Sequence, residues 1–139
     1  MAAELAATLH GGEVIALVGD LGAGKTTFVQ GLCEALGVKS RVTSPTFAIL
    51  NVHKADGLTL KITHLDLYRI KSAREIVALG LEEFLGAPDT VTVIEWPDVV
   101  DGVQWNPTIT VSLRTLSSQE RDIIIAYANE GGLLSAKHA

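Results

Sequence analysis

Segment 19–26 is the feature that most restricts what this chain of 139 residues can fold into. It reads Gly-Asp-Leu-Gly-Ala-Gly-Lys-Thr and fits the pattern G-x-x-x-x-G-K-[ST] of phosphate-binding loops without a mismatch. The apolar residues 13–18 before it are typical of a buried strand, and residues 26–36 after it are typical of a helix. A strand, a glycine-rich loop and a helix in this order predict an α/β fold whose sheet is parallel around the loop.

The loop predicts a nucleotide site because of what its residues can supply. Glycine adopts backbone angles that are closed to other residues, so successive N–H groups can turn inward around phosphate oxygens. Lys25 supplies a mobile charge for the β- and γ-phosphates, and the Thr26 hydroxyl can ligate Mg²⁺. The start of the helix adds unpaired amides and its positive dipole end. The residues predicted to bind the nucleotide here are Asp20, Leu21, Gly22, Ala23, Gly24, Lys25, Thr26 and Thr27.

Composition limits the remaining classes of protein. Hydrophobic residues make up 47% and charged residues 19% of the chain, which fits one folded domain over residues 1–139. No apolar run approaches the roughly 18 residues that span a bilayer, and no secretory signal is recognisable, so we expect a cytoplasmic protein without membrane contact. Cys33 is the single cysteine and is expected to pack in the interior. The formal net charge of −5 argues against stand-alone nucleic-acid binding, which usually needs a basic surface.

Hydrophobic periodicity and turn residues predict the other elements. Helical stretches are expected over 3–9, 26–36, 72–79 and 81–85, and strands over 13–18, 47–53, 58–65, 90–95, 108–113 and 122–128. Strands 47–53 and 58–65 flank a turn signal and resemble a hairpin. The strongly β-branched strand 90–95 is expected to be central, and the two last strands are expected to form antiparallel edges. The fold class is therefore a three-layer α/β fold like that of P-loop NTPases, with a mixed, partly parallel central sheet.

Two acids are candidates for the magnesium site that hydrolysis requires. Ligands of open α/β sheets bind at the carboxyl ends of strands, where Asp66 ends the run 60–66 and Glu95 ends the run 91–95. The run before Glu95 is the better match to a buried strand, whereas aspartate is the side chain more often used at this position. The alternative for each acid is a strand end that caps a helix or faces solvent. Given the loop, we expect at least one of them to be functional.

Three further positions have both a functional and a structural interpretation. The hydroxyls of Ser44 and Thr46 could fold over the γ-phosphate, but an ordinary proline turn explains the segment as well. His64 lies in a predicted strand, where a structural histidine is the favoured interpretation over a catalytic one. Trp96 follows Glu95 and could either pack over the site or cover the edge of the sheet.

Taken together, these segments resemble the TsaE (formerly YjeE) family of bacterial tRNA threonylcarbamoyladenosine biosynthesis proteins. The resemblance covers nearly the whole chain, in order and approximate spacing. Its matching segments are 19–28, 44–47 (Ser-Pro-Thr-Phe), 64–69 (His-Leu-Asp-Leu-Tyr-Arg), 79–83 (Leu-Gly-Leu-Glu-Glu) and 95–97 (Glu-Trp-Pro). The first is shared with many ATPases, and the later ones are far more specific.

The resemblance implies a small Mg²⁺-dependent ATPase that works with the TsaD and TsaB proteins and is slow without them. That machinery attaches threonylcarbamoyl to adenosine 37 of tRNA, and the partners would hold the tRNA. Carried over by position, Thr26 and Glu95 bind Mg²⁺, and Asp66 corresponds to the acid of a Walker B motif. Ser44 and Thr46 form a switch-like segment. The catalytic set implied is Lys25, Asp66, Glu95 and Thr46. Trp96 corresponds to the aromatic after the metal-site glutamate, and Ser44 and Trp96 are also expected to bind the nucleotide.

In one respect the match to the family is incomplete. Family members usually have a further segment before the stretch that matches residues 2–9, so we name no adenine-contacting residue before Glu13.

Two other functions are alternatives to this ATPase. A small nucleotide or metabolite kinase is the first alternative, although no segment offers an arginine-rich lid. A GTP-dependent switch is the second, although Asn-Lys-x-Asp and Asp-x-x-Gly are missing from the sequence.

Overall fold

One mixed sheet organises the residues that the computed structural model describes, which are 2–20, 22, 24–38, 50–54, 60–99, 102–103, 105–128 and 134–138. Within them the sheet has seven strands in the order β2-β3-β4-β1-β5-β6-β7. The elements are α1 (Ala2–Ala6), β1 (Val14–Gly19), α2 (Lys25–Ala35), β2 (Leu50–Lys54), β3 (Lys61–Asp66), α3 (Ala73–Val77), the 3-10 turn η1 (Leu81–Glu83), β4 (Thr90–Glu95), β5 (Ile109–Thr115), β6 (Arg121–Ala128) and β7 (Leu134–His138).

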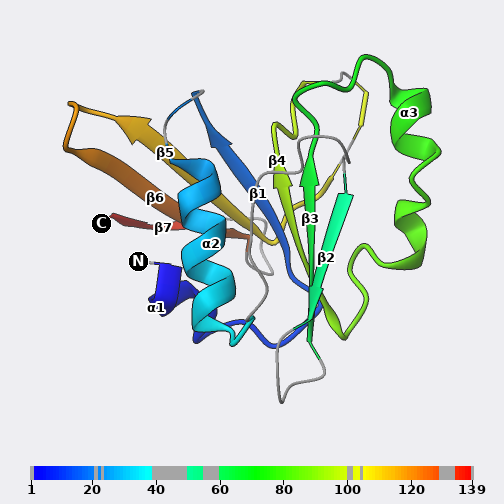
Figure 1. Ribbon diagram of the computed structural model, residues 1–139, viewed down its shortest axis with the longest axis horizontal. Coiled ribbons are helices and arrows are strands. Elements are labelled where there is room, and N and C mark those ends of the chain that lie inside the picture. The colour runs from blue at the N-terminus through cyan, green and yellow to red at the C-terminus, as the bar shows by residue number, and fades with distance from the viewer. Residues whose placement is uncertain are drawn as a thin grey trace.

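The centre of the sheet is parallel and its edges are antiparallel. Strands β3, β4, β1 and β5 run in one direction, so their carboxyl ends meet at one edge (Figure 1). Strand β2 pairs antiparallel with β3, which confirms the predicted hairpin. Strands β6 and β7 continue the sheet antiparallel beyond β5. The predicted mixed, partly parallel sheet is confirmed.

The last strands differ from the sequence-based expectation in two respects. Strand β5 is interior and parallel to β1, not an antiparallel edge. Its alternating burial shows which side chains face the core, but alternation is the same for either strand direction. Strand β7 was not predicted, since its sequence Leu-Ser-Ala-Lys-His contains no β-branched residue. It forms by pairing its backbone with β6, an interaction that side-chain pattern does not encode.

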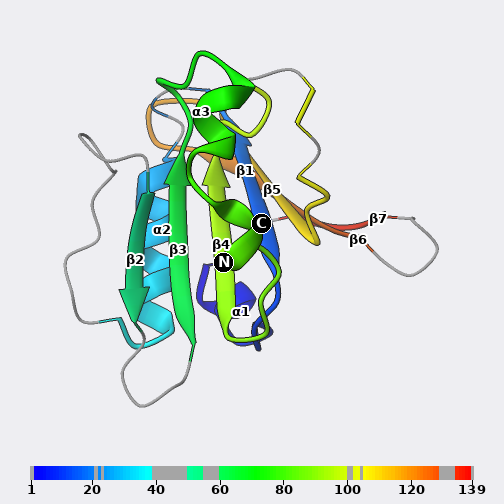
Figure 2. The same ribbon diagram turned by 90° about the vertical axis from the view of Figure 1, so that its right-hand side faces the viewer.

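Helices cover both faces of the sheet. Figure 2 shows α2 behind β2 and β3, whereas α3 lies near the upper ends of β3 and β4. Val93 of β4 packs in the cluster with α1 and α2, whereas the next residue, Ile94, packs in the cluster with α3 and η1. Every residue of β4 is buried, as predicted for a central strand between two layers. The predicted three-layer α/β architecture is confirmed, and none of the described helices is long and apolar enough to cross a membrane.

Local sequence signals explain where α2 ends and where α3 begins. Helix α2 ends at Ala35, and Gly37 follows it with a φ of +87° that allows the Val38 amide to donate to the Cys33 carbonyl at 2.9 Å. Helix α3 begins with a capping box, in which Glu75 accepts from the Ser72 amide at 3.1 Å. Both ends agree with the sequence to within a few residues.

Candidate nucleotide-binding site

The glycine-rich loop connects the carboxyl end of β1 to the start of α2. Gly22 and Gly24 have φ values of +83° and +97°, a region that strongly favours glycine. Gly24 is the N-cap of α2 and, having no side chain, blocks none of the amides behind it. The sequence therefore places glycine where the backbone must turn back on itself to enter the helix.

The first turn of α2 contains three of the predicted ligands. Lys25, Thr26 and Thr27 are the first residues of the helix. Lys25 is buried, Thr26 is partly buried and Thr27 is exposed. The amides of a first helical turn have no acceptor within the helix, and the helix dipole adds partial positive charge there. This end of α2 is therefore suited to bind an anion such as phosphate.

Lys25 lies in a pocket of backbone oxygens and one aromatic ring. Its Nζ donates hydrogen bonds to the carbonyl oxygens of Gly19, at 2.5 Å, and Asp20, at 3.2 Å. The same atom is 3.7 Å from the centre of the Trp96 ring, which is a cation–π contact. Burial lowers the pKa of Lys25, and nearby carboxylates, led by Glu95 and followed by Asp66, partly offset this by favouring the charged form. The ammonium is thus hydrogen-bonded to the loop backbone and lies in the electrostatic field of the two acids.

The two candidate acids lie side by side at the ends of neighbouring strands. Asp66 of β3 and Glu95 of β4 are direct partners in the parallel register, and Glu95 also pairs with Leu17 of β1. Glu95 is 2% exposed, whereas Asp66 is partly exposed and its Oδ1 accepts from the Tyr68 amide at 3.1 Å. Both acids thus lie at the edge of the sheet from which the loop leaves.

His64 also belongs to this cluster, although the sequence favoured a purely structural interpretation. Its ring is fully buried, and Nε2 lies 2.6 Å from Oε2 of Glu95. His64 is two residues before Asp66, and strand alternation puts both on the face of the sheet that carries Glu95. That spacing was the available signal, since it placed His64 on the same face as a candidate metal ligand.

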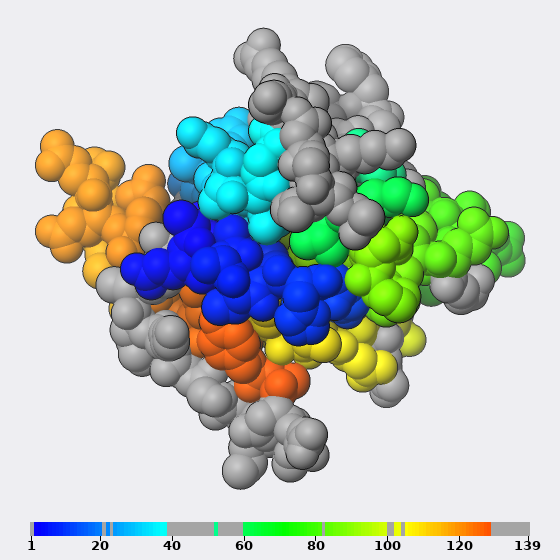
Figure 3. Space-filling view, turned by 90° about the horizontal axis from the view of Figure 1, so that it is seen from below, coloured from blue at the N-terminus to red at the C-terminus, as the bar shows by residue number. Residues whose placement is uncertain are grey.

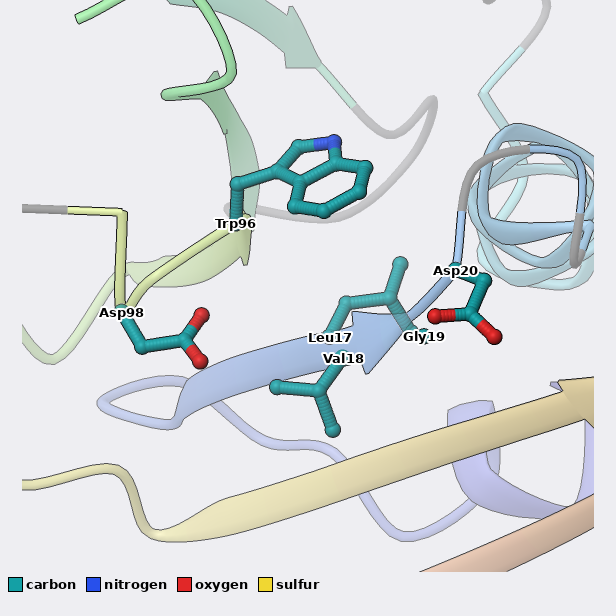
Figure 4. Close-up of a pocket in the computed structure, with 6 residues that line it drawn as sticks. All are labelled: Leu17, Val18, Gly19, Asp20, Trp96 and Asp98. Atoms are coloured by element: carbon teal, nitrogen blue, oxygen red, sulfur yellow. The ribbon is translucent and has the colours of Figure 1, made fainter.

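A cavity of about 200 Å³ opens beside the loop. It is lined by Leu17, Val18, Gly19, Asp20, Trp96 and Asp98. Figure 4 shows the Trp96 indole above the end of β1, with the carboxylates of Asp20 and Asp98 at opposite sides. Trp96 has a φ of +60°, a conformation that is costly for a bulky residue and that often occurs at functional sites. Of its two interpretations, the structure supports packing over the site, and Asp98 is a lining residue that sequence reasoning missed.

Four predicted residues cannot be placed. Leu21 and Ala23 of the loop, and Ser44 and Thr46 of the switch-like segment, lie outside the described residues. Within the described part of the chain, no group of three or more His, Cys, Asp or Glu side chains could hold a metal ion by itself. A hydroxyl and one or two carboxylates do suit Mg²⁺ that is shared with nucleotide phosphates, because this ion keeps few protein ligands. The donor groups of Thr26, Glu95 and Asp66 are of the kind that suits such an ion.

Comparison with known proteins decides the family. A model of the family described as "Threonylcarbamoyl adenosine biosynthesis protein TsaE" matches residues 1–123. The chain belongs to the TsaE family. A relative from Treponema pallidum, named as a tRNA threonylcarbamoyladenosine biosynthesis protein TsaE, is 39% identical over 118 residues, covering 85% of this chain and 84% of its own. One of the same name from Rickettsia bellii is 40% identical over 121 residues, covering 86% and 81%.

A solved structure supports the TsaE assignment at the level of the fold. The crystal structure of Bacillus subtilis YdiB superposes with a TM-score of 0.72 at 30% identity. The superposition covers 94% of this chain and 78% of that chain. The TsaE family and the α/β fold inferred from the sequence are thus both confirmed.

Proposed function

We propose that this TsaE family member binds ATP with Mg²⁺ at the loop and hydrolyses it, as one subunit of the machinery that makes tRNA threonylcarbamoyladenosine. The observation that carries the proposal is the convergence at one sheet edge of Lys25, Asp66 and Glu95. A phosphate-binding loop that faces two strand-end carboxylates is the arrangement that positions a magnesium nucleotide for in-line attack by water.

Each side chain has a role in this proposal. The loop amides and Lys25 would hold the phosphates, and Thr26 and Glu95 would hold the ion. Asp66 would orient the attacking water. Bound Mg²⁺ would neutralise charge on the β- and γ-phosphates. Ser44 and Thr46 would respond to the γ-phosphate, and Trp96 would leave Lys25 and contact the nucleotide.

Partners are part of the proposal. TsaD and TsaB would accelerate a slow intrinsic turnover and would bind the tRNA, so that this subunit contacts tRNA only through the complex. The net charge of −5 supports this division, since an acidic subunit is poorly suited to bind a polyanion directly. Localisation in the cytoplasm follows from a role in tRNA modification.

The test is phosphate release from ATP, with and without a purified TsaD–TsaB complex. Magnesium-dependent release that the complex accelerates would support the proposal. The kinase alternative would instead transfer phosphate to an added nucleoside or metabolite. Phosphorylated acceptor without free phosphate, or equal competition by GTP and ATP, would overturn the proposed function.

A further inference from the structure

His64 is the buried polar side chain whose contacts most need an explanation. It lies on β3, is 0% exposed, and reaches across to β4. Its one hydrogen-bond partner among the described residues is Glu95, at 2.6 Å between Nε2 and Oε2. Its other nitrogen, Nδ1, is buried without a hydrogen-bond partner there. An unpaired buried polar atom costs stability, so a residue chosen for packing alone would avoid it.

The contacts decide which nitrogen carries the hydrogen. A carboxylate can only accept, so the ring must donate from Nε2 to Oε2. In a neutral ring the hydrogen then lies on Nε2 and Nδ1 remains a bare acceptor, which is less costly to bury than a donor with no acceptor. With Glu95 ionised, the 2.6 Å contact therefore assigns the hydrogen to Nε2, directed at Glu95.

We infer that His64 is a positioning residue, which fixes the Glu95 carboxylate so that Oε2 is occupied and Oε1 is directed to the metal of a bound nucleotide. The hydrogen bond from His64 reaches Oε2 and not Oε1. Glutamate has three rotatable side-chain bonds, and one hydrogen bond from a rigid ring removes much of that freedom. Groups that orient a metal ligand in this way typically change metal affinity by 10- to 100-fold. The inference rests on the proposed function, because it gives Glu95 the role of a metal ligand.

The first test compares two substitutions of similar size in nucleotide binding. His64→Gln can still donate an N–H near the position of Nε2, whereas His64→Leu fills the space without a donor. Affinity for a non-hydrolysable ATP analogue is measured by calorimetry with Mg²⁺ and with EDTA. We expect the ratio of the two affinities to fall roughly tenfold in His64→Leu and to be largely restored in His64→Gln, while affinity in EDTA stays within about twofold.

The control is His10→Leu, which removes the exposed histidine that pairs with Glu13 before β1, at the opposite end of that strand from the loop. It should leave both affinities unchanged. A wild-type magnesium ratio in His64→Leu would overturn the inference. An equal loss in His64→Gln, or a parallel loss in EDTA, would also overturn it, because either result indicates packing and not positioning.

The second test needs neither nucleotide nor metal. Long-range ¹H–¹⁵N correlation spectra of the wild-type protein report which ring nitrogen of His64 is protonated. We expect a proton on Nε2, with a strongly downfield resonance that moves upfield in Glu95→Gln, since a bond to an amide is weaker than one to a carboxylate. A proton on Nδ1 alone would overturn the inference even if the variants do not fold. Absence of nucleotide binding by the wild type would instead overturn the proposed function.

Discussion

Two buried glutamates with histidine partners lie at opposite ends of adjacent strands, and they are held in different ways. Glu13 directly precedes β1 and is 8% exposed; Glu95 ends β4 and is 2% exposed. Glu13 accepts from the backbone amides of His10, at 3.0 Å, and Gly11, at 2.7 Å. The His10 ring is 3.5 Å away and its side chain is 84% exposed. Figure 3 shows this end of the molecule, where the N-terminal segment, in blue, lies beside the segment before β4.

Glu95 is held by side chains from other elements. Its carboxylate meets the His64 ring from β3 and the field of Lys25 from α2. Local backbone donors that occupy both oxygens, as at Glu13, make an acid part of a turn. One donor from a neighbouring strand, with a buried cation near, leaves an acid able to take a ligand. Burial and a histidine neighbour alone therefore do not distinguish a structural acid from a functional one, whereas the origin of the donors does.

The largest effect is expected at Lys25, the cation that distinguishes the surroundings of Glu95 from those of Glu13. Lys25→Ala should reduce affinity for ATP by about a hundredfold or more, because a buried partner of the phosphates is lost. Equilibrium titration with a fluorescent ATP analogue measures this. Wild-type affinity in this variant would show that Lys25 does not bind the phosphates. The cation near Glu95 would then not distinguish this acid functionally from Glu13.

A matched pair of substitutions tests the two glutamates directly. Glu95→Gln should lower magnesium-dependent phosphate release by roughly a hundredfold, because a neutral amide stabilises the ion and the developing charge poorly. Its effect on ATP affinity should be smaller. Glu13→Gln is the control and should change phosphate release less than twofold. Similar losses of turnover in both variants would show that the contrast between the two ends has no functional meaning.

The substitution at Glu13 should change the stability of the protein and not its turnover. Glu13→Gln replaces one accepting oxygen by an N–H group that faces a backbone donor, so unfolding should become easier by about 1–3 kcal/mol. Urea denaturation of the nucleotide-free protein measures this. A midpoint equal to that of the wild type would show that the amides of His10 and Gly11 do not depend on the carboxylate.

The smallest effect concerns Cys33, a buried group of α2 whose pKa is shifted by burial alone. Burial raises the pKa of the thiol from 9.0 to about 11. The unfolded chain therefore releases this proton at lower pH than the folded protein does. The stability that Cys33 contributes is fully present below pH 9 and is lost as the pH rises from 9 to 11. Urea denaturation at a series of pH values should show less alkaline destabilisation in Cys33→Ala; an unchanged pH profile would contradict the assignment.

The tertiary structure corrected the sequence interpretation where pairing between strands decides the outcome. The alternation in β5 shows its core face but not its direction, and β7 exists through backbone pairing with β6. His64 looked structural because a strand position reveals its face and not its cross-strand neighbour. The parallel register of β3 and β4 brought it to Glu95.

The sequence by itself determined the loop, the buried strand before it, the helix after it and the two acids at strand ends. These features are local, because glycine conformations, helix signals and hydrophobic period act over a few neighbouring residues. Only the tertiary structure decided that Asp66 and Glu95 are adjacent, that Trp96 lies over Lys25, and that Glu13 is a part of a turn while Glu95 faces the loop. Those relations join residues far apart in the chain, and they arise when the sheet fixes its strand order and register.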